Sequence, residues 1–323
     1  MEELTVLFTK VISPFYYPFF STQRIFWLYL LGALLLAYPV YRIHASESGI
    51  RGFLRFCLPG SIYKHSSAVL DYKYYFVNRI AFVVLFLPLI LGSSTAAAWT
   101  NDILCWATAV PGLGHPPGTA AALLLTCIWV VVFDAGFFVG HYLLHRLPML
   151  WEFHKIHHSA EVLTPITVYR MHPVDDLLIA TMAGLLTGVV GGVFRFVYAG
   201  SIEQYLLLEL NAGLFLFYLV GYNLRHSHVW LPYPRALSHL LISPAQHQIH
   251  HSNAVQHYDR NMGFIFAIWD WMAGTLYVPN GKEELTFGLA DDEHLEYSGV
   301  IRLYFLPFQK LVARYRRMRD VAP

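Results

Sequence analysis

Long apolar runs that lack charged residues dominate the pattern of this chain. A helix that crosses a bilayer needs about 17–25 mostly apolar residues, because its backbone polar groups must be satisfied internally. Five stretches approach or reach this length, and the last two are predicted to form a hairpin that turns near Gly200 and Ser201. The stretches are residues 25–41, 80–100, 119–140, 177–199 and 203–222. The pattern therefore predicts an all-α fold, a multi-pass transmembrane helical bundle of four or five spans.

The polar segments between these runs carry the positive charge unevenly. With five spans, residues 42–79, 141–176 and 223–323 lie on one side of the membrane, and they hold 19 of the 22 Lys and Arg residues. Cytoplasmic loops are enriched in Lys and Arg, so this side is predicted to be cytoplasmic. The last residues, Val-Ala-Pro, do not form an ER-retrieval signal, which favours a bacterial inner membrane over the ER membrane.

Composition agrees with a membrane protein and excludes some partners. The chain of 323 residues is 56% apolar and 13% charged, whereas an ordinary soluble domain has about 25% charged residues. The formal net charge is +1, so no basic field is available to bind a nucleic acid backbone. The three cysteines are far apart and form no Cys-x-x-Cys pair, which supports neither a disulfide framework nor a thiolate zinc site.

Histidine is concentrated in two windows of the sequence. Of 17 histidines, 13 lie within residues 141–172 and 226–257, which the predicted hairpin of two spans places on the same side of the membrane. Many are three or four residues apart, so on helices their imidazoles lie side by side. Ser243, followed by a proline and by Gln246, predicts the capped start of a helix just before the second window. The three groups are His141 and His145; His154, His157 and His158; and His247, His250 and His251.

These groups predict a metal centre in a helical cap on the cytoplasmic face. Imidazole suits Fe, Zn, Cu and Ni. One metal ion takes about four to six ligands, so eight histidines are most economically explained by two metal ions close together. The Glu-x-x-His pairs of soluble di-iron bundles are absent from the chain, as is the His-Glu-x-x-His motif of metalloproteases.

Three further residues are candidates for the same site. His226 directly follows the last apolar run, and we favour it as a ninth ligand over a surface residue. His172, before Pro173, is interpreted either as a ligand or as a donor that supports one. Asp134 lies two helical turns before His141, where its carboxylate either orients a ligand imidazole or bonds to a neighbouring span.

The order and spacing of these segments resemble the signatures of the fatty acid hydroxylase/sterol desaturase superfamily. The resemblance covers residues 134–275, and it departs from the family pattern at Tyr142, where Arg is frequent, and at His228, where Asn is expected. The segments that carry it are Asp134 to His145, Trp151 to Ser159, Arg170 to Pro173, His226-Ser227, Ser243 to Ser252, His257 to Gly263 and Trp269 to Thr275.

The resemblance implies an integral-membrane di-iron oxygenase that uses O2 and two electrons to hydroxylate or desaturate a lipid, such as a sterol or a fatty acyl chain. It implies that the eight grouped histidines are iron ligands, with His226 a further one. Flavin, NAD and cytochrome fingerprints are absent from the sequence, so a separate electron donor is expected, a cytochrome b5- or ferredoxin-type protein with its reductase.

The predicted organisation has three parts. Residues 1–133 are expected to form N-terminal membrane spans, residues 134–275 the catalytic domain, and residues 276–323 a cytoplasmic amphipathic tail that lies on the membrane or forms a solvated helix. The alternative function is a histidine-rich membrane metal transporter or metal-binding protein, which would place its histidines near the middle of the spans. A membrane cytochrome would need paired histidines within the spans, and 25–41, 80–100 and 177–222 contain none.

Overall fold

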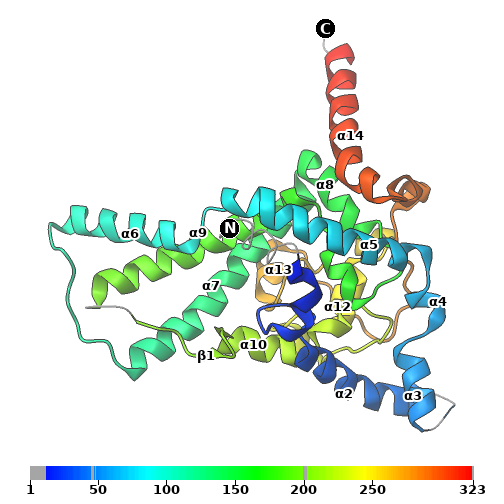
Figure 1. Cartoon of the computed structure of the whole chain (residues 1–323), viewed down its shortest axis with the longest axis horizontal. Helices are drawn as coiled ribbons and strands as arrows, with labels where there is room; N and C mark the ends of the chain where they lie inside the picture. The colour runs from blue at the N-terminus through cyan, green and yellow to red at the C-terminus, as the bar shows by residue number, and fades with distance from the viewer. Residues whose placement is uncertain (1–11, 45–46, 48, 199–201, 322–323) are drawn as a thin grey trace.

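A computed structural model describes residues 12–44, 47, 49–198 and 202–321 and shows a mainly helical protein (Figure 1). In the described part, a single short antiparallel hairpin, β1 (Leu206–Leu207) with β2 (Leu210–Asn211), accompanies the helices. The larger helices are α2 (Trp27–His44), α5 (Ser66–Ala81), α6 (Ser93–Thr108), α7 (Thr119–Arg146), α8 (Pro148–His158), α9 (Pro173–Val197) and α14 (Val300–Val321). The shorter ones are α3 (Ile50–Cys57), α4 (Gly60–Tyr63), α10 (Ala212–Leu219), α11 (Arg235–Ser238), α12 (Pro244–His250) and α13 (Ile268–Ala273).

Three helices, α6, α7 and α9, extend together from the rest of the molecule to a tip at the left of Figure 1. Among the described residues, α7 and α9 are the helices that are long and apolar enough to cross a membrane, while α2 is apolar but shorter. Both agree with predicted spans, and their composition indicates a membrane protein.

The predicted span 80–100 is not one continuous helix. The chain leaves α5 through a π-helical turn at Phe82–Phe86 and a 3-10 turn at Leu87–Leu89, and α6 begins only at Ser93. Pro88 lies in the 3-10 turn and has no amide hydrogen to continue the helical ladder, which explains the break. The apolar composition predicted a span here, but composition does not indicate where the backbone turns.

The predicted span 203–222 is also wrong as a continuous helix. This segment forms the β1–β2 hairpin, the eight-residue helix α10 and a 3-10 turn at Tyr222–Leu224. Leu208 and Glu209 have positive φ angles of 46° and 67°, which form the hairpin turn, and the Asn211 side chain caps α10 by accepting from the amide of Gly213. The predicted turn at Gly200 and Ser201 lies outside the described residues.

Small residues hold α6, α7 and α9 together. Gly136 and Gly140 of α7 lie against the backbone of α9, where an added Cβ would come within 2.6 Å of Ala183 Cα and 2.9 Å of Ile179 Cα. On the other face of α9, Gly184, Gly188 and Gly192 lie against the start of α6. Such a four-residue repeat of small side chains lets helices approach closely in a membrane, where packing replaces the hydrophobic effect.

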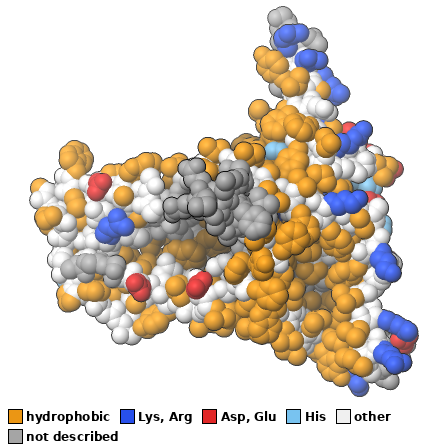
Figure 2. All heavy atoms as spheres, in the orientation of Figure 1, with side chains coloured by type: hydrophobic (Ala, Val, Ile, Leu, Met, Phe, Trp, Pro, Cys, Tyr) orange, Lys and Arg blue, Asp and Glu red, His pale blue; other side chains and the backbone are white. Residues whose placement is uncertain are grey.

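The opposite end of the molecule carries the polar core. Helices α8 and α12 meet there with the C-terminal end of α7. The first half of α14 packs Leu303 and Leu306 against Tyr74 and Ile156. The second half of α14 projects from the body, with both basic and apolar side chains at its surface (Figure 1). In Figure 2 most of the visible Lys and Arg side chains lie over α14 and along the right edge down to the end near α3, and one lies near the tip of α6, α7 and α9.

Candidate metal centre

Four elements bring nine histidines into one buried site. Helix α7 contributes His141 and His145, one turn apart near its C-terminal end, and α8 contributes three histidines from its last turn and a half. Helix α12 contributes His247 and His250, and His251 follows as its C-cap residue. The helix begins as predicted, because Ser243 caps it and exchanges hydrogen bonds with Gln246. The ninth, His226, follows the 3-10 turn at Tyr222–Leu224.

The nine imidazoles form two groups, within each of which the potential ligand atoms lie within 4.8 Å of one another. The groups touch because neighbouring residues of α8 and of α12 point into different groups: the rings of His157 and His158 are 5.7 Å apart, and those of His250 and His251 are 5.3 Å apart. The first group is His141, His145, His154, His158 and His250, and the second is His157, His226, His247 and His251.

In the second group the Nε2 atoms converge on one point. Nε2 of His226 lies 3.1 Å from that of His251, 3.2 Å from that of His247 and 3.4 Å from that of His157. A neutral imidazole has one N–H, so four such atoms facing one another cannot all be satisfied by bonds among themselves. Four nitrogens about 2.0–2.1 Å from one metal ion in a tetrahedron lie about 3.4 Å apart, so the donors fit a metal ion at their centre.

In the first group, four of the five imidazoles are held from behind. Nδ1 of His154 lies 3.2 Å from Asp175 Oδ2, and Nδ1 of His145 lies 3.3 Å from Asp259 Oδ1. Nδ1 of His141 donates to the Met262 carbonyl at 2.7 Å, and Nδ1 of His250 to the Arg260 carbonyl at 2.8 Å. Because the proton then sits on Nδ1, the lone pair of Nε2 is free toward the centre of the group.

Buried imidazole nitrogens without a hydrogen-bond partner also indicate that the first group suits a metal ion. Within the described structure, Nε2 of His145, His158 and His250 is buried without a hydrogen-bond partner. An unpaired buried nitrogen is costly unless a ligand satisfies it. Since these atoms point into the first group, its donor set fits a bound metal ion.

A single loop, residues 257–263, supplies three of the four acceptors behind the first group. Its backbone turns sharply, with positive φ angles of 55° at Asp259 and 56° at Asn261. Asp270 holds the loop by accepting from the amides of Met262 at 2.8 Å and Gly263 at 2.7 Å. An added Cβ at Gly263 would lie 2.7 Å from Asp270 Oδ2, so this residue must be small.

Asp134 on α7 holds the segment that directly follows this loop. Its carboxylate accepts from the amides of Ile265 at 2.6 Å and Phe266 at 2.9 Å, and from the indole of Trp269 at 2.8 Å. It therefore does not bond directly to an imidazole but fixes the segment that follows the loop, whose Met262 carbonyl holds His141. Of the two interpretations of Asp134 from sequence, hydrogen bonding to a neighbouring segment describes the geometry better.

Burial keeps the imidazoles of α8, α12 and the His226 segment neutral. It lowers the pKa of His157 to about 3 and those of His158, His247 and His251 well below 6.5, and neighbouring histidines lower the last three further. Metal ligation requires the unprotonated nitrogen, so the site is prepared for cations at neutral pH.

Of the eight histidines outside both groups, three were singled out in the sequence windows and have other partners. His172 caps α9, with Nδ1 accepting from the Val174 amide at 3.1 Å and Nε2 lying 3.3 Å from the Tyr304 carbonyl, so neither nitrogen is available to a metal ion. His228 Nε2 bonds to the Phe56 carbonyl at 2.6 Å, and His257 Nε2 to Glu283 at 2.9 Å. The structure thus assigns His172 a capping role in place of the ligand or donor role suggested from sequence.

The carboxylate behind His154 was missed in the sequence. Asp175 is fully buried in the first turn of α9, 21 residues after its partner. The available signal was an acid two residues after the His-Pro start of α9, close in sequence to the first histidine window. It did not indicate which imidazole the carboxylate contacts.

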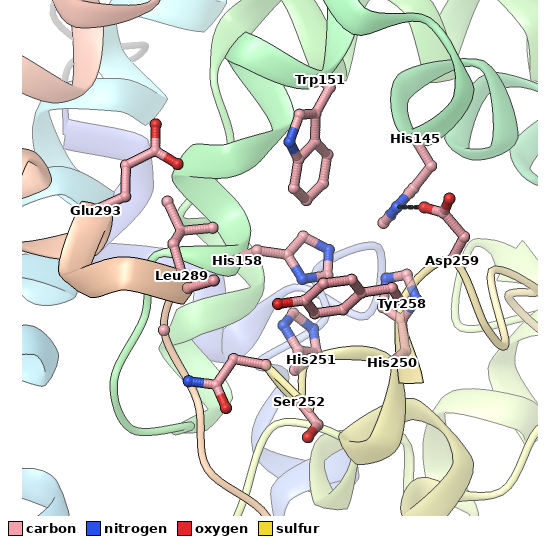
Figure 3. A pocket seen from close by; sticks show the side chains of 13 residues that line it. His145, Trp151, His158, His250, His251, Ser252, Tyr258, Asp259, Leu289 and Glu293 are labelled. Atoms are coloured by element: carbon pink, nitrogen blue, oxygen red, sulfur yellow. Dashed lines mark hydrogen bonds and ion pairs between the residues drawn. The ribbon is translucent and has the colours of Figure 1, made fainter. Parts of the chain in front are cut away.

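A cavity of about 330 Å³ opens onto the first group (Figure 3). His145, His158, His250 and His251 line it, with Trp151 above the imidazoles and the Tyr258 ring among them in the view. Its volume is within the range of small-molecule sites, so reactants have access to the histidines from this side. We call it the outer cavity.

Comparison with known proteins agrees with this geometry. The sequence model of the fatty acid hydroxylase family matches residues 126–275, which include all nine histidines. The chain is 25% identical over 161 residues to ornithine lipid hydroxylase OlsE of Rhizobium tropici, covering 50% of this chain and 44% of the relative. It is 26% identical over 161 residues to alkylglycerol monooxygenase of Caenorhabditis elegans, covering 50% and 28%. Sphinganine C4-monooxygenase 1 of Arabidopsis thaliana is 26% identical over 158 residues, covering 48% and 54%.

These matches leave much of each protein unaligned. The chain spans from 28% to 54% of the length of these three relatives. No solved structure gives a significant match to the chain. The likeness is therefore strongest over the segment that builds the histidine site.

Proposed function

Because the chain belongs, through residues 126–275, to the fatty acid hydroxylase/sterol desaturase superfamily, we propose that it is an O2-dependent, di-iron lipid hydroxylase or desaturase. The observation that carries the proposal is the pair of adjacent, all-histidine donor groups, whose buried nitrogens converge as metal ligands do. The relatives' names, which describe lipid hydroxylases and monooxygenases, support a lipid-modifying oxygenase.

The chain's own residues hold and shield the reaction. Two iron ions, when bound, supply the two-electron chemistry by which O2 oxidises an unactivated C–H bond. His141, His145, His154, His158 and His250 would hold one, and His157, His226, His247 and His251 the other. Asp175 and Asp259 orient two of these imidazoles, and buried aromatic rings such as Phe137 and Phe264 exclude water from the inner side of the site.

The overall reaction requires an external reductant. Hydroxylation converts a C–H bond and O2, with two electrons and two protons, into an alcohol and water, and desaturation uses the same inputs to release two waters. We propose that a separate cytochrome b5- or ferredoxin-type protein with its reductase delivers the electrons. The site would face the cytoplasm, with the substrate taken from the bilayer, and residues 1–133, 134–275 and 276–323 would act as membrane, catalytic and tail regions.

A metal transporter is not supported. The donor groups lie where α7 ends and α8 and α12 meet, rather than midway along the two apolar helices. A transport site is expected near the midplane, where discontinuous helices form a path between the two faces.

Comparative lipid analysis tests the proposal. The chain and its His157→Ala/His250→Ala variant are expressed in the same bacterial host, and total lipids are compared by mass spectrometry. The intact chain should produce a lipid heavier by one oxygen, or lighter by two hydrogens, which the double variant does not produce. The matched control is His115→Ala/His239→Ala, which removes two exposed histidines outside both groups and should retain the product. Identical lipids with and without the active chain, in a host that supplies an electron donor, would contradict the proposal.

A further inference from the structure

A second cavity reaches the histidines from the inner side. It is lined by His141, His154, His157, His226 and His247, of which the outer cavity touches none. We call it the inner cavity. Its apolar wall includes Phe137, Met171, Ile179 and Phe264.

Two arginines also line the inner cavity. Arg225 is 2% exposed; its Nη2 donates to the Ile242 carbonyl at 2.6 Å, while its buried Nη1 has no partner among the described residues. Arg24 comes from the turn before α2, and its guanidinium carbon lies 5.7 Å from the centre of the Phe264 ring. The Asn223 side chain donates to the Arg24 carbonyl at 3.0 Å, which ties this turn to the segment that carries Arg225 and His226.

The described acids do not neutralise these cations. Neither arginine has a described carboxylate within ion-pair distance. Two nearby acids have other partners: Asp134 accepts hydrogen bonds from the amides of residues 265 and 266 and from Trp269, and Asp176 forms an ion pair with Arg79. Arginine does not lose its proton in proteins, and Arg225 is a buried cation without a described counterion, which is unfavourable. Arg24 is half-buried, and its side chain forms a hydrogen bond with Tyr218. The nine neutral histidines add no negative charge. An anion bound in the inner cavity would therefore stabilise the positive charge of the arginines.

The shape of the inner cavity limits that anion. Its volume is about 30 Å³, room for about two water-sized groups. A carboxylate fits this space, and the two parallel N–H groups of an arginine guanidinium can donate to its two oxygens. The apolar side chains beside the arginines suit the methylene groups that follow a carboxylate in an acyl chain.

We propose that Arg24 and Arg225 form a carboxylate-binding subsite in the inner cavity. The substrate is then a lipid with a free carboxylate, whose head occupies the cavity beside the histidines and whose alkyl chain leaves it along the apolar wall. That the bound lipid is then oxidised depends on the proposed function. That it binds here depends only on the two arginines and the inner cavity. Arg24 lies outside the matched residues 126–275. The five-span prediction placed it on the opposite side of the membrane from the histidines, but in the structure it lines the same cavity as they do. The N-terminal region thus contributes a specificity residue to the site.

Equilibrium binding to the purified full chain in detergent tests the subsite without turnover. The probes are octanoate, methyl octanoate and octyl phosphate, which share an alkyl chain and differ in the head. Octanoate should bind at least about tenfold more tightly than its methyl ester, because a charge-assisted pair is lost in the ester. Octyl phosphate should bind more weakly than octanoate, since its head is larger.

Variants assign the effect to Arg24. Arg24→Gln should weaken octanoate binding about tenfold while leaving the ester unchanged, and Arg24→Lys should restore part of the affinity. Arg235→Gln, an exposed arginine outside the inner cavity, is the matched control and should bind as the native chain does. Thermal unfolding of each variant confirms that it is folded.

Each outcome decides the proposal. Equal affinity for octanoate and its ester in the native chain, or a folded Arg24→Gln that still prefers octanoate, overturns it, and equal binding of octyl phosphate overturns the commitment to a carboxylate. If Arg24→Gln does not fold, the comparison of octanoate with its ester and the Arg24→Lys variant decide. A chain that binds octanoate through Arg24 but leaves lipids unchanged would refute the oxygenase and keep the subsite, so the two failures are distinguishable.

Discussion

In the first group, the hydrogen-bond partner of Nδ1 sets the orientation of four of the five imidazoles. Three of these partners are a carboxylate and two carbonyls on the loop 257–263, and the fourth is Asp175 on α9. Fixing Nδ1–H toward an oxygen aims the lone pair of Nε2 and raises its basicity. Residues that never touch the metal should therefore control its retention.

Asp175→Asn tests this at a single atom pair. The amide can no longer act as a charged acceptor for Nδ1 of His154, so one of two metal ions should be held about 10–100-fold more weakly. Metal content by mass spectrometry after dialysis against graded chelator measures the change. Asp176→Asn is the matched control, because the adjacent carboxylate pairs with Arg79 instead. Equal metal retention in the two variants would show that Asp175 does not support the site.

The buried imidazole of His172 should make the stability of the folded chain depend on pH. Burial lowers its pKa to about 4, from 6.5. The unfolded chain therefore takes up a proton near pH 6.5 while the folded chain does so only near pH 4. Its contribution to stability is present above pH 6.5 and is lost as the pH falls toward 4, by up to about 1.4 kcal/mol per pH unit.

The test is His172→Asn, which keeps an acceptor at the N-cap of α9 and removes the titrating group. Its melting temperature should fall less steeply than that of the native chain between pH 6.5 and 4.5. The surface variant His239→Asn should keep the native slope. Parallel melting curves for His172→Asn and the native chain would contradict the assignment.

At the scale of elements, close helix contact fixes the tip of the molecule. Gly188 of α9 lies against α6, where an added Cβ would come within 2.6 Å of the Ser93 carbonyl oxygen. Gly191, one turn away, has only Ala97 Cβ at 3.5 Å. The two glycines therefore form a matched pair on one helix.

Gly188→Ala should destabilise the chain by about 1–3 kcal/mol, because the methyl group forces α6 and α9 apart. Gly191→Ala should be neutral or slightly stabilising, since alanine favours the helix and fills open space. Thermal unfolding in detergent measures both. A Gly188→Ala variant as stable as Gly191→Ala would mean that α6 and α9 do not pack as described.

In the whole molecule, the tip of α6, α7 and α9 and the histidine site lie at opposite ends. Which end faces which side of the membrane can therefore be tested. The uneven charge predicts that the histidine end is cytoplasmic. Leu113, between α6 and α7, is 51% exposed, and Val255, near α12, is 77% exposed. With Cys57, Cys105 and Cys127 replaced by Ser, a cysteine at 113 should react with an impermeant maleimide in intact bacterial cells. A cysteine at 255 should react only after lysis, and the reverse pattern would invert the proposed orientation.

The sequence by itself determined the local features. Spacings of three and four residues on helices α7, α8 and α12 specify which imidazoles share a face, and Ser243 with Gln246 specifies where α12 begins, because both depend on neighbours within one turn. The order of these segments also identified the family that residues 126–275 match.

Only the tertiary structure decided the rest. Hydropathy predicted spans at 80–100 and 203–222, but Pro88 and the turn at Leu208 and Glu209 break them, since apolar content does not fix backbone direction. Which histidines share a donor group, that Asp175 supports His154, and that Arg24 reaches the inner cavity all depend on contacts between distant segments. Such contacts form when helices pack, and no local pattern encodes them.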